Sequence, residues 1–248
     1  MKKTLLAVAL ASSLISFGAV AADKAPEPDF TFTGNFGLFS DYRFRGISQT
    51  AKRAAIQGGF DFAHKSGAYL GSWNSNVDSA FLAGSTIEMD IYGGYATEIK
   101  GVGLNVGVLR YEYPGVTSGS TSPGTTEAYI GISYGPVSYK YSRSLTNYFA
   151  STAASNTGGT TYNEINLSQS VTEKIAIVAH VGKTNVANTS TGDYTDYKIG
   201  ISYDLGGYSL GLNYFSNTGL NTAEKLANTY SGQKAYESGA VVSISKTF

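Results

Sequence analysis

Hydrophobic and polar residues alternate with a period of two along most of the chain. From residue 30 the even positions are mainly apolar or aromatic: Phe30, Phe32, Phe36, Leu38, Tyr42 and Phe44. The odd positions between them are mainly polar: Thr31, Thr33, Asn35, Asp41, Arg43 and Arg45. Successive side chains of a β-strand point to opposite faces, so this pattern predicts a strand with one apolar and one polar face. About twelve such segments follow one another and end with AVVSISKTF.

The connections between these segments alternate between short and long. HKSG, TEIKG, GP, TEK and LGG are short, whereas the links between them are longer and rich in Ser, Thr, Asn and Gly. Outer-membrane barrels have short periplasmic turns and longer external loops. The pattern therefore predicts an all-β fold, a transmembrane up-and-down antiparallel β-barrel of about 12 strands, over residues 30–248.

The N-terminus has the features of an export signal. Residues 1–22 contain two lysines, then an apolar run, then small residues at the expected cleavage site, which is typical of a cleaved signal peptide. Residues 23–29 (DKAPEPD) are charged and interrupted by proline, and we interpret them as a periplasmic lead-in. The predicted location after export is the cell outer membrane.

Composition excludes several classes of protein. Gly 30, Tyr 19 and Phe 12 against Pro 5 favour many strands joined by tight turns. With Cys 0 there is no disulfide or thiolate metal site. Lys+Arg 18 balance Asp+Glu 18, and loss of Lys2 and Lys3 with the signal peptide leaves 16 basic and 18 acidic residues. No basic excess points to a nucleic-acid partner.

Aromatic residues gather at the predicted strand ends. One set lies at the short-turn ends and predicts a periplasmic girdle: Phe62, Tyr69, Tyr95, Tyr134, Tyr139, Tyr203, Tyr208 and Phe248. A second set predicts the outer girdle: Tyr42, Phe44, Trp73 and Tyr214. The terminal Phe248 resembles the signal by which outer-membrane barrels bind their assembly machinery, although Lys246 stands where an aromatic residue is more usual.

Several motifs resemble the TorF-type family of proteobacterial porin-like outer-membrane proteins. They are FSDYRFRGISQT (residues 39–50), QGGFD (57–61), TEAYIGISYG and YTDYKIGISYDLG. The resemblance extends over essentially the whole mature chain. It implies an outer-membrane barrel and no particular transport substrate.

The polar face of the strands predicts a charged lumen. Its ionisable residues are Asp41, Arg43, Arg45, Asp61, Glu88, Asp90, Glu127, Lys140, Glu164, His180, Asp196 and Lys198. Opposed charges at one depth can form a constriction that selects small polar solutes. Seven acids against four bases predict a narrow channel with a slight cation preference. The same charges could instead pair with one another and close the lumen, and the sequence does not separate these two arrangements.

Two other functions are weighed against a channel. In a non-conducting structural barrel, adhesin or receptor, residues 216–237 with Tyr230 and Tyr236 form the expected binding loop. A barrel hydrolase would need a base, and the only histidines are His64, in a predicted turn, and His180. No motif supplies a partner to either, so we predict no catalytic residue, no metal site and no cofactor. The expected partners are membrane lipid, small polar solutes and the assembly machinery, and the sequence does not distinguish a monomer from a trimer.

Overall fold

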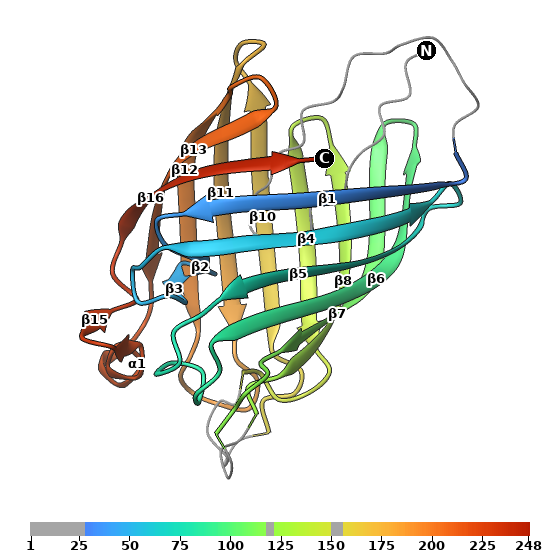
Figure 1. Cartoon of the computed structure of the whole chain (residues 1–248). Coiled ribbons are helices and arrows are strands. Elements are labelled where there is room, and N and C mark those ends of the chain that lie inside the picture. The colour runs from blue at the N-terminus through green and yellow to red at the C-terminus, as the bar shows by residue number, and fades with distance from the viewer. Residues whose placement is uncertain (1–27, 118–121, 150–155) are drawn as a thin grey trace.

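Twelve antiparallel strands close into a barrel in the computed structural model, which describes residues 28–117, 122–149 and 156–248 (Figure 1). The barrel strands are β1 (Phe30–Phe39), β4 (Ala55–His64), β5 (Ala68–Asn76), β6 (Ile87–Ile99), β7 (Val102–Glu112), β8 (Thr125–Tyr134), β9 (Val137–Ser144), β10 (Thr161–Ser170), β11 (Ile175–Asn185), β12 (Tyr194–Asp204), β13 (Tyr208–Thr218) and β16 (Gly239–Thr247). The predicted fold class is confirmed. Residues 1–22, and all but the end of 23–29, lie outside the described residues.

Each strand pairs with its neighbours in chain order, and the last strand closes the ring against the first. β16 pairs with β1 from Asn35↔Thr247 to Phe39↔Ser243. On its other edge β1 pairs with β4 over its full length, from Phe30↔His64 to Phe39↔Ala55. Closure leaves no free sheet edge, so the backbone groups of the ring are hydrogen-bonded without water.

Exposure follows the alternation of the sequence. On β12 the outward Ile199 and Ile201 are 61% and 50% exposed, whereas the inward Asp196 of the same strand is 2% exposed. Outward side chains form an apolar surface that needs a lipid environment, and inward side chains are polar. The sequence therefore sets which face of each strand meets lipid.

Tyrosine rings lie over glycines on the inner wall. Tyr129 is the register partner of Gly107, and a Cβ atom added to Gly107 would lie 2.2 Å from the Tyr129 hydroxyl. Tyr92 covers Gly71 in the same way, with its ring 2.4 Å from an added Cβ. These glycines let large inward side chains lie flat along the wall instead of across the lumen.

The long connections contain structure that the alternation did not predict. Loop 1 (residues 40–54) holds the hairpin of β2 (Arg43–Phe44) and β3 (Ile47–Ser48). Loop 6 (residues 219–238) holds α1 (Thr222–Ala227), begun by an Asn221–Glu224 capping box, and the hairpin of β14 (Thr229–Tyr230) and β15 (Gln233–Lys234). Among the described residues, no helix is long and apolar enough to cross a bilayer.

The aromatic girdles are only partly as predicted. Seven of the eight residues at the short-turn ends are exposed on the outside, but the hydroxyl of Tyr69 instead bonds Asn105 and Tyr129. In the outer set Tyr214 is exposed, whereas Trp73 is buried inside and packs against Tyr42. Tyr69 and Trp73 share the inner face of β5, and alternation is weak in this segment because neither face carries a charged residue, so the phase was read wrongly from sequence.

Candidate functional site

The inner wall carries most of the ionisable residues singled out from the sequence. They lie on seven of the twelve strands: Asp61 on β4, Glu88 and Asp90 on β6, Glu127 on β8, Lys140 on β9, Glu164 on β10, His180 on β11, and Asp196 and Lys198 on β12. Glu88, Asp90, Glu127 and Asp196 are each at most 2% exposed. These four lie near the loop ends of their strands, on the side of loop 1, whereas Asp61 lies closer to the short-turn end of β4.

Loop 1 is folded into the barrel. β1 ends before the β2–β3 hairpin (Figure 1), at Phe39, rather than continuing to Arg45. Nearly every residue from 41 to 51 is buried. Arg45 and Gly46 have positive φ values of 45° and 79°, which make the tight turn of the hairpin. The predicted continuation of the first strand was therefore wrong, and Asp41, Arg43 and Arg45 reach the lumen from a loop. The alternation persists there because a hairpin has the same period as a spanning strand.

Hydrogen bonds inside loop 1 fix its shape. The Asp41 carboxylate accepts from the Ser48 hydroxyl at 2.6 Å and from the Thr50 hydroxyl at 3.1 Å. It also forms an ion pair with Arg43, with Nε and Oδ2 2.5 Å apart. These contacts with three side chains hold the loop together as one unit.

Arg45 joins loop 1 to the opposite wall. Its Nη2 lies 3.0 and 2.8 Å from the two carboxylate oxygens of Glu127, and its Nη1 donates to the Tyr148 hydroxyl at 2.9 Å. The guanidinium carbon is also 4.0 Å from the centroid of the Tyr162 ring. Both charged side chains are nearly inaccessible, so the pair is a buried, hydrogen-bonded contact of the kind that is costly to break.

Tyr42 forms a second contact with the wall. Its hydroxyl donates to Oε1 of Glu88 at 3.1 Å, and its ring packs edge-on against Trp73. Burial, with the nearby Glu88 and Asp90 carboxylates, raises the pKa of Tyr42 well above its usual value, so the phenol keeps the proton that it donates. Tyr42 and Phe44, predicted to face lipid, therefore lie inside the lumen. Phe44 contacts the rings of Tyr111 and Phe149.

Two carboxylate oxygens in this region have no hydrogen-bond partner among the described atoms. They are Oε2 of Glu88 and Oδ1 of Asp90, which lie two residues apart on the inner face of β6. Buried polar atoms normally have partners, so this carboxyl pair is unusual among the polar groups beside loop 1.

A second polar network lies on the wall formed by β9 to β12. Lys140 Nζ is 2.7 Å from Glu164, and the Tyr162 hydroxyl donates to Asp196 at 3.0 Å. His180 Nε2 lies 2.9 Å from Asp196, and its Nδ1 lies 2.7 Å from the side-chain oxygen of Asn166. The Tyr162 hydroxyl also lies 2.9 Å from His180 Nε2, so both ring nitrogens have polar partners on this wall. His64 lies at the end of β4 and contacts Ser66.

Loop 6 covers loop 1 from the other side. Arg43 Nη1 donates to the backbone oxygens of Ala235 and Glu237 at 3.2 and 2.7 Å. The Tyr230 hydroxyl donates to the Ser48 backbone oxygen, and its ring stacks on Phe81. Tyr230, expected in an accessible binding loop, is therefore buried against loop 1.

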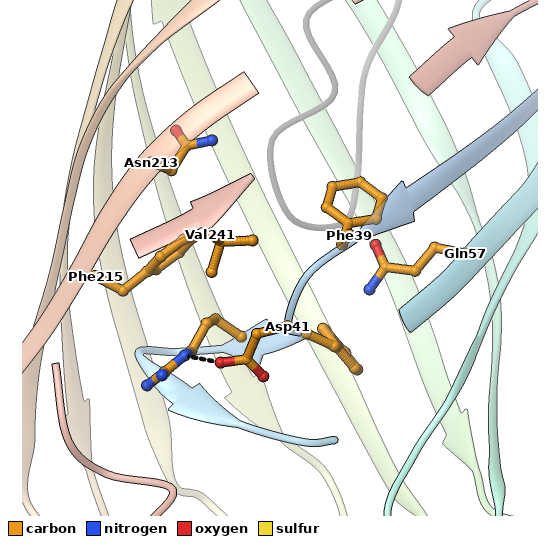
Figure 2. A pocket seen from close by; sticks show the side chains of 8 residues that line it. Phe39, Asp41, Gln57, Asn213, Phe215 and Val241 are labelled. Atoms are coloured by element: carbon orange, nitrogen blue, oxygen red, sulfur yellow. Dashed lines mark hydrogen bonds and ion pairs between the residues drawn. The ribbon is translucent and has the colours of Figure 1, made fainter. Parts of the chain in front are cut away.

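A small cavity remains between loop 1 and the wall. Its volume is about 20 Å³, enough for roughly one water molecule. Figure 2 shows the Asp41–Arg43 ion pair at its edge and two amides, Gln57 and Asn213, across from each other. The lining is completed by Phe39, Tyr42, Phe215 and Val241. Among the described residues, no three His, Asp or Glu side chains gather in a way that could hold a metal ion.

The sequence reasoning missed the tyrosines of the lumen. Tyr92, Tyr111, Tyr129 and Tyr162 are buried on the inner face, and their hydroxyls or rings contact the charged residues or cover the glycines. Their inward phase could have been read from the same alternation that placed Glu127 and Glu164.

A closed antiparallel barrel with an apolar outer face and a charged lumen is the architecture of porins. The chain is similar to the solved "KdgM porin in complex with disordered oligogalacturonate", with TM-score 0.56, 8% identity, and coverage of 87% of this chain and 99% of that one. It is also similar to the NanC porin, with TM-score 0.54, 10% identity, and coverage of 88% and 99%. At such identities the likeness establishes the porin fold.

The chain belongs to the family described as "Bacterial protein of unknown function (Gcw_chp)", whose model matches residues 23–248. No curated protein sequence matches it. The narrower resemblance to TorF-type proteins stays a prediction.

Proposed function

We propose that this protein is an outer-membrane channel through which small polar solutes diffuse passively, with loop 1 as the constriction of a narrow charged lumen. The observation that carries the proposal is the placement of Arg45, a permanent positive charge, inside a ring that contains the Glu127, Glu88 and Asp90 carboxylates. Opposed charges at one level of a lumen create a transverse field that favours small polar solutes. The similarity in fold to KdgM and NanC supports the proposal.

Loop 1 is suited to act as a constriction because it is tied to the wall by polar contacts rather than by a continuous sheet. Its hairpin pairs only with itself, and its link to β8 is the Arg45–Glu127 pair. A segment held in this way can shift without opening the barrel, because the ring of twelve strands closes without it. Charges that pair in the resting lumen then become available to solutes.

The proposed lumen prefers cations. Seven acids and four bases were assigned to it, and two of the carboxylates keep oxygens without partners, Oε2 of Glu88 and Oδ1 of Asp90. An excess of negative potential along the path raises the local concentration of cations.

Conductance in planar bilayers tests the proposal. We expect the purified protein to give small single-channel steps and a cation-selective reversal potential in a salt gradient. In a matched variant, residues 41–53 are replaced by a short Gly-Ser linker, which is feasible because Phe39 and Ala55 are register partners. This variant should give larger steps. Absence of steps from both folded proteins would contradict a channel.

A second candidate function is a non-conducting barrel that binds partners through its external loops. It is favoured by the ordered structure of loop 6, where α1 presents Leu226 at 74% exposure. Deletion of residues 221–236 separates the two functions. It should leave bilayer steps in place for a channel, whereas for a binding barrel it should abolish adhesion of intact cells to host or bacterial surfaces.

A further inference from the structure

Three basic residues lie on the outside of the barrel, at the loop ends of alternate strands. Arg110, Arg143 and Lys183 lie at or near the loop ends of β7, β9 and β11. Their neighbours in sequence Tyr111, Ser142 and Thr184 are buried on the inner face, so by alternation the three bases point outward. We call these three residues the basic band.

The register makes the basic band continuous around one side of the barrel. Arg143 pairs with Thr161 of β10, and Lys183 pairs with Asn163 two residues further along the same strand. Arg110 pairs with Thr126 of β8, the strand between β7 and β9. On the same strand Arg143 pairs with Ala128, so none of these residues between the bases is charged. On the other nine barrel strands, the outward residues nearest the long loops are uncharged.

The positive charge of the band is largely uncompensated. Arg110 forms an ion pair with Glu112, with Nε and Oε1 2.6 Å apart. Arg143 and Lys183 are exposed, and neither has a carboxylate within ion-pair distance in the described part of the chain. A surface with free guanidinium and ammonium groups favours phosphate ligands, which arginine can bind in a bidentate manner.

An apolar surface lies directly below the band. Val108 and Val181, two residues before Arg110 and Lys183 on the same face, are 46% and 38% exposed. A ligand that satisfies both regions must carry anionic groups next to acyl chains. A soluble anion would contact only the basic band, whereas a phosphorylated lipid can contact both the basic band and the apolar surface below it.

We propose that the basic band binds the phosphate groups of the outer-leaflet glycolipid, with Arg143 and Lys183 as the main contacts. The inference rests on the proposed outer-membrane location with the long loops outside, and it adds a lipid partner to the proposed channel. The band faces away from the lumen, so binding at this surface is independent of the solute path.

Binding of diphosphorylated lipid A to the detergent-purified protein tests the inference. We expect the Arg143→Gln/Lys183→Gln variant to bind about 25-fold more weakly, since each basic residue near an anionic lipid surface contributes about fivefold in affinity. The matched control is Lys100→Gln/Lys174→Gln, which removes two exposed lysines from turns at the other rim. The control should bind like the wild type, and lipid A without phosphates should bind weakly to all three proteins.

Equal affinity of the wild type and the Arg143→Gln/Lys183→Gln variant, each shown to be folded by heat-modifiable gel mobility, would overturn the inference. An equal loss in the control would also overturn it, because the effect would then follow net charge alone. The conductance of the same preparations separates this inference from the proposed function. A wild type that binds lipid A through the band but gives no steps would refute only the channel.

Discussion

Arg45 and Glu127 meet inside the barrel, although one lies on loop 1 and the other on β8, 82 residues away. Two hydrogen bonds of 3.0 and 2.8 Å join Nη2 of the arginine to the carboxylate. This pair fixes the position of the loop across the lumen.

Replacing Arg45 with glutamine should release loop 1 from the wall. The change leaves the Glu127 carboxylate buried without its partner, which typically costs about 3–5 kcal/mol. We expect larger or longer single-channel openings in planar bilayers and a lower midpoint of urea unfolding. Arg53→Gln is the control, because the Arg53 side chain is 64% exposed and only approaches Asp78 at 3.4 Å. Unchanged openings in Arg45→Gln would show that loop 1 does not restrict the path.

Neutralising the unpartnered carboxylates should reduce ion selectivity. In the Glu88→Gln/Asp90→Asn variant, we expect the reversal potential in a salt gradient to move toward zero, because the path loses the negative charge that this carboxyl pair carries. The control variant Asp29→Asn/Glu173→Gln removes two negative charges from exposed residues that lie outside the barrel strands. It should leave the reversal potential unchanged. If both variants shift it equally, selectivity arises at the rim and not beside loop 1.

Adding a methyl group at Gly107 should destabilise the barrel. The new Cβ would lie 2.2 Å from the Tyr129 hydroxyl and 2.7 Å from the Gly93 backbone oxygen, so the wall must shift. Overpacking of this kind costs about 1–3 kcal/mol, to be measured by urea unfolding in detergent micelles. At Gly131 the nearest atom to an added Cβ is 3.6 Å away, so Gly131→Ala should be far milder. Similar losses in the two variants would rule out the ring contact as the cause.

The contact between Lys52 and Glu237 should make the packing of loops 1 and 6 sensitive to acid. A hydrogen bond from Lys52 holds the pKa of Glu237 below its usual value. A carboxyl with a lowered folded-state pKa stabilises above the unfolded value of about 4.3, and that stabilisation is lost as the pH falls through the folded value. Glu237→Gln should therefore lower the melting temperature slightly at neutral pH and should match the wild type in strong acid. A difference that grows as the pH falls would contradict this linkage.

The barrel itself follows from the sequence alone. Alternation of apolar and polar residues predicted about twelve strands, and short and long connections predicted their up-and-down order; both match the closed ring. The prediction succeeded because each barrel strand lies between lipid and lumen, so one local period of two records the environment of both faces. The same alternation also predicted that the side chains of Glu127, Glu164 and Asp196 point into the lumen.

Only the tertiary structure decided what occupies the lumen. The residues from Asp41 to Arg45 continue the alternation of β1, yet they belong to a hairpin folded inside the ring, where Tyr42 meets Trp73 and Glu88. A period of two is the same for a strand that crosses lipid and for a hairpin packed against an inner wall. The difference lies in contacts between residues far apart in the chain, such as Arg45 with Glu127, and no local pattern encodes those.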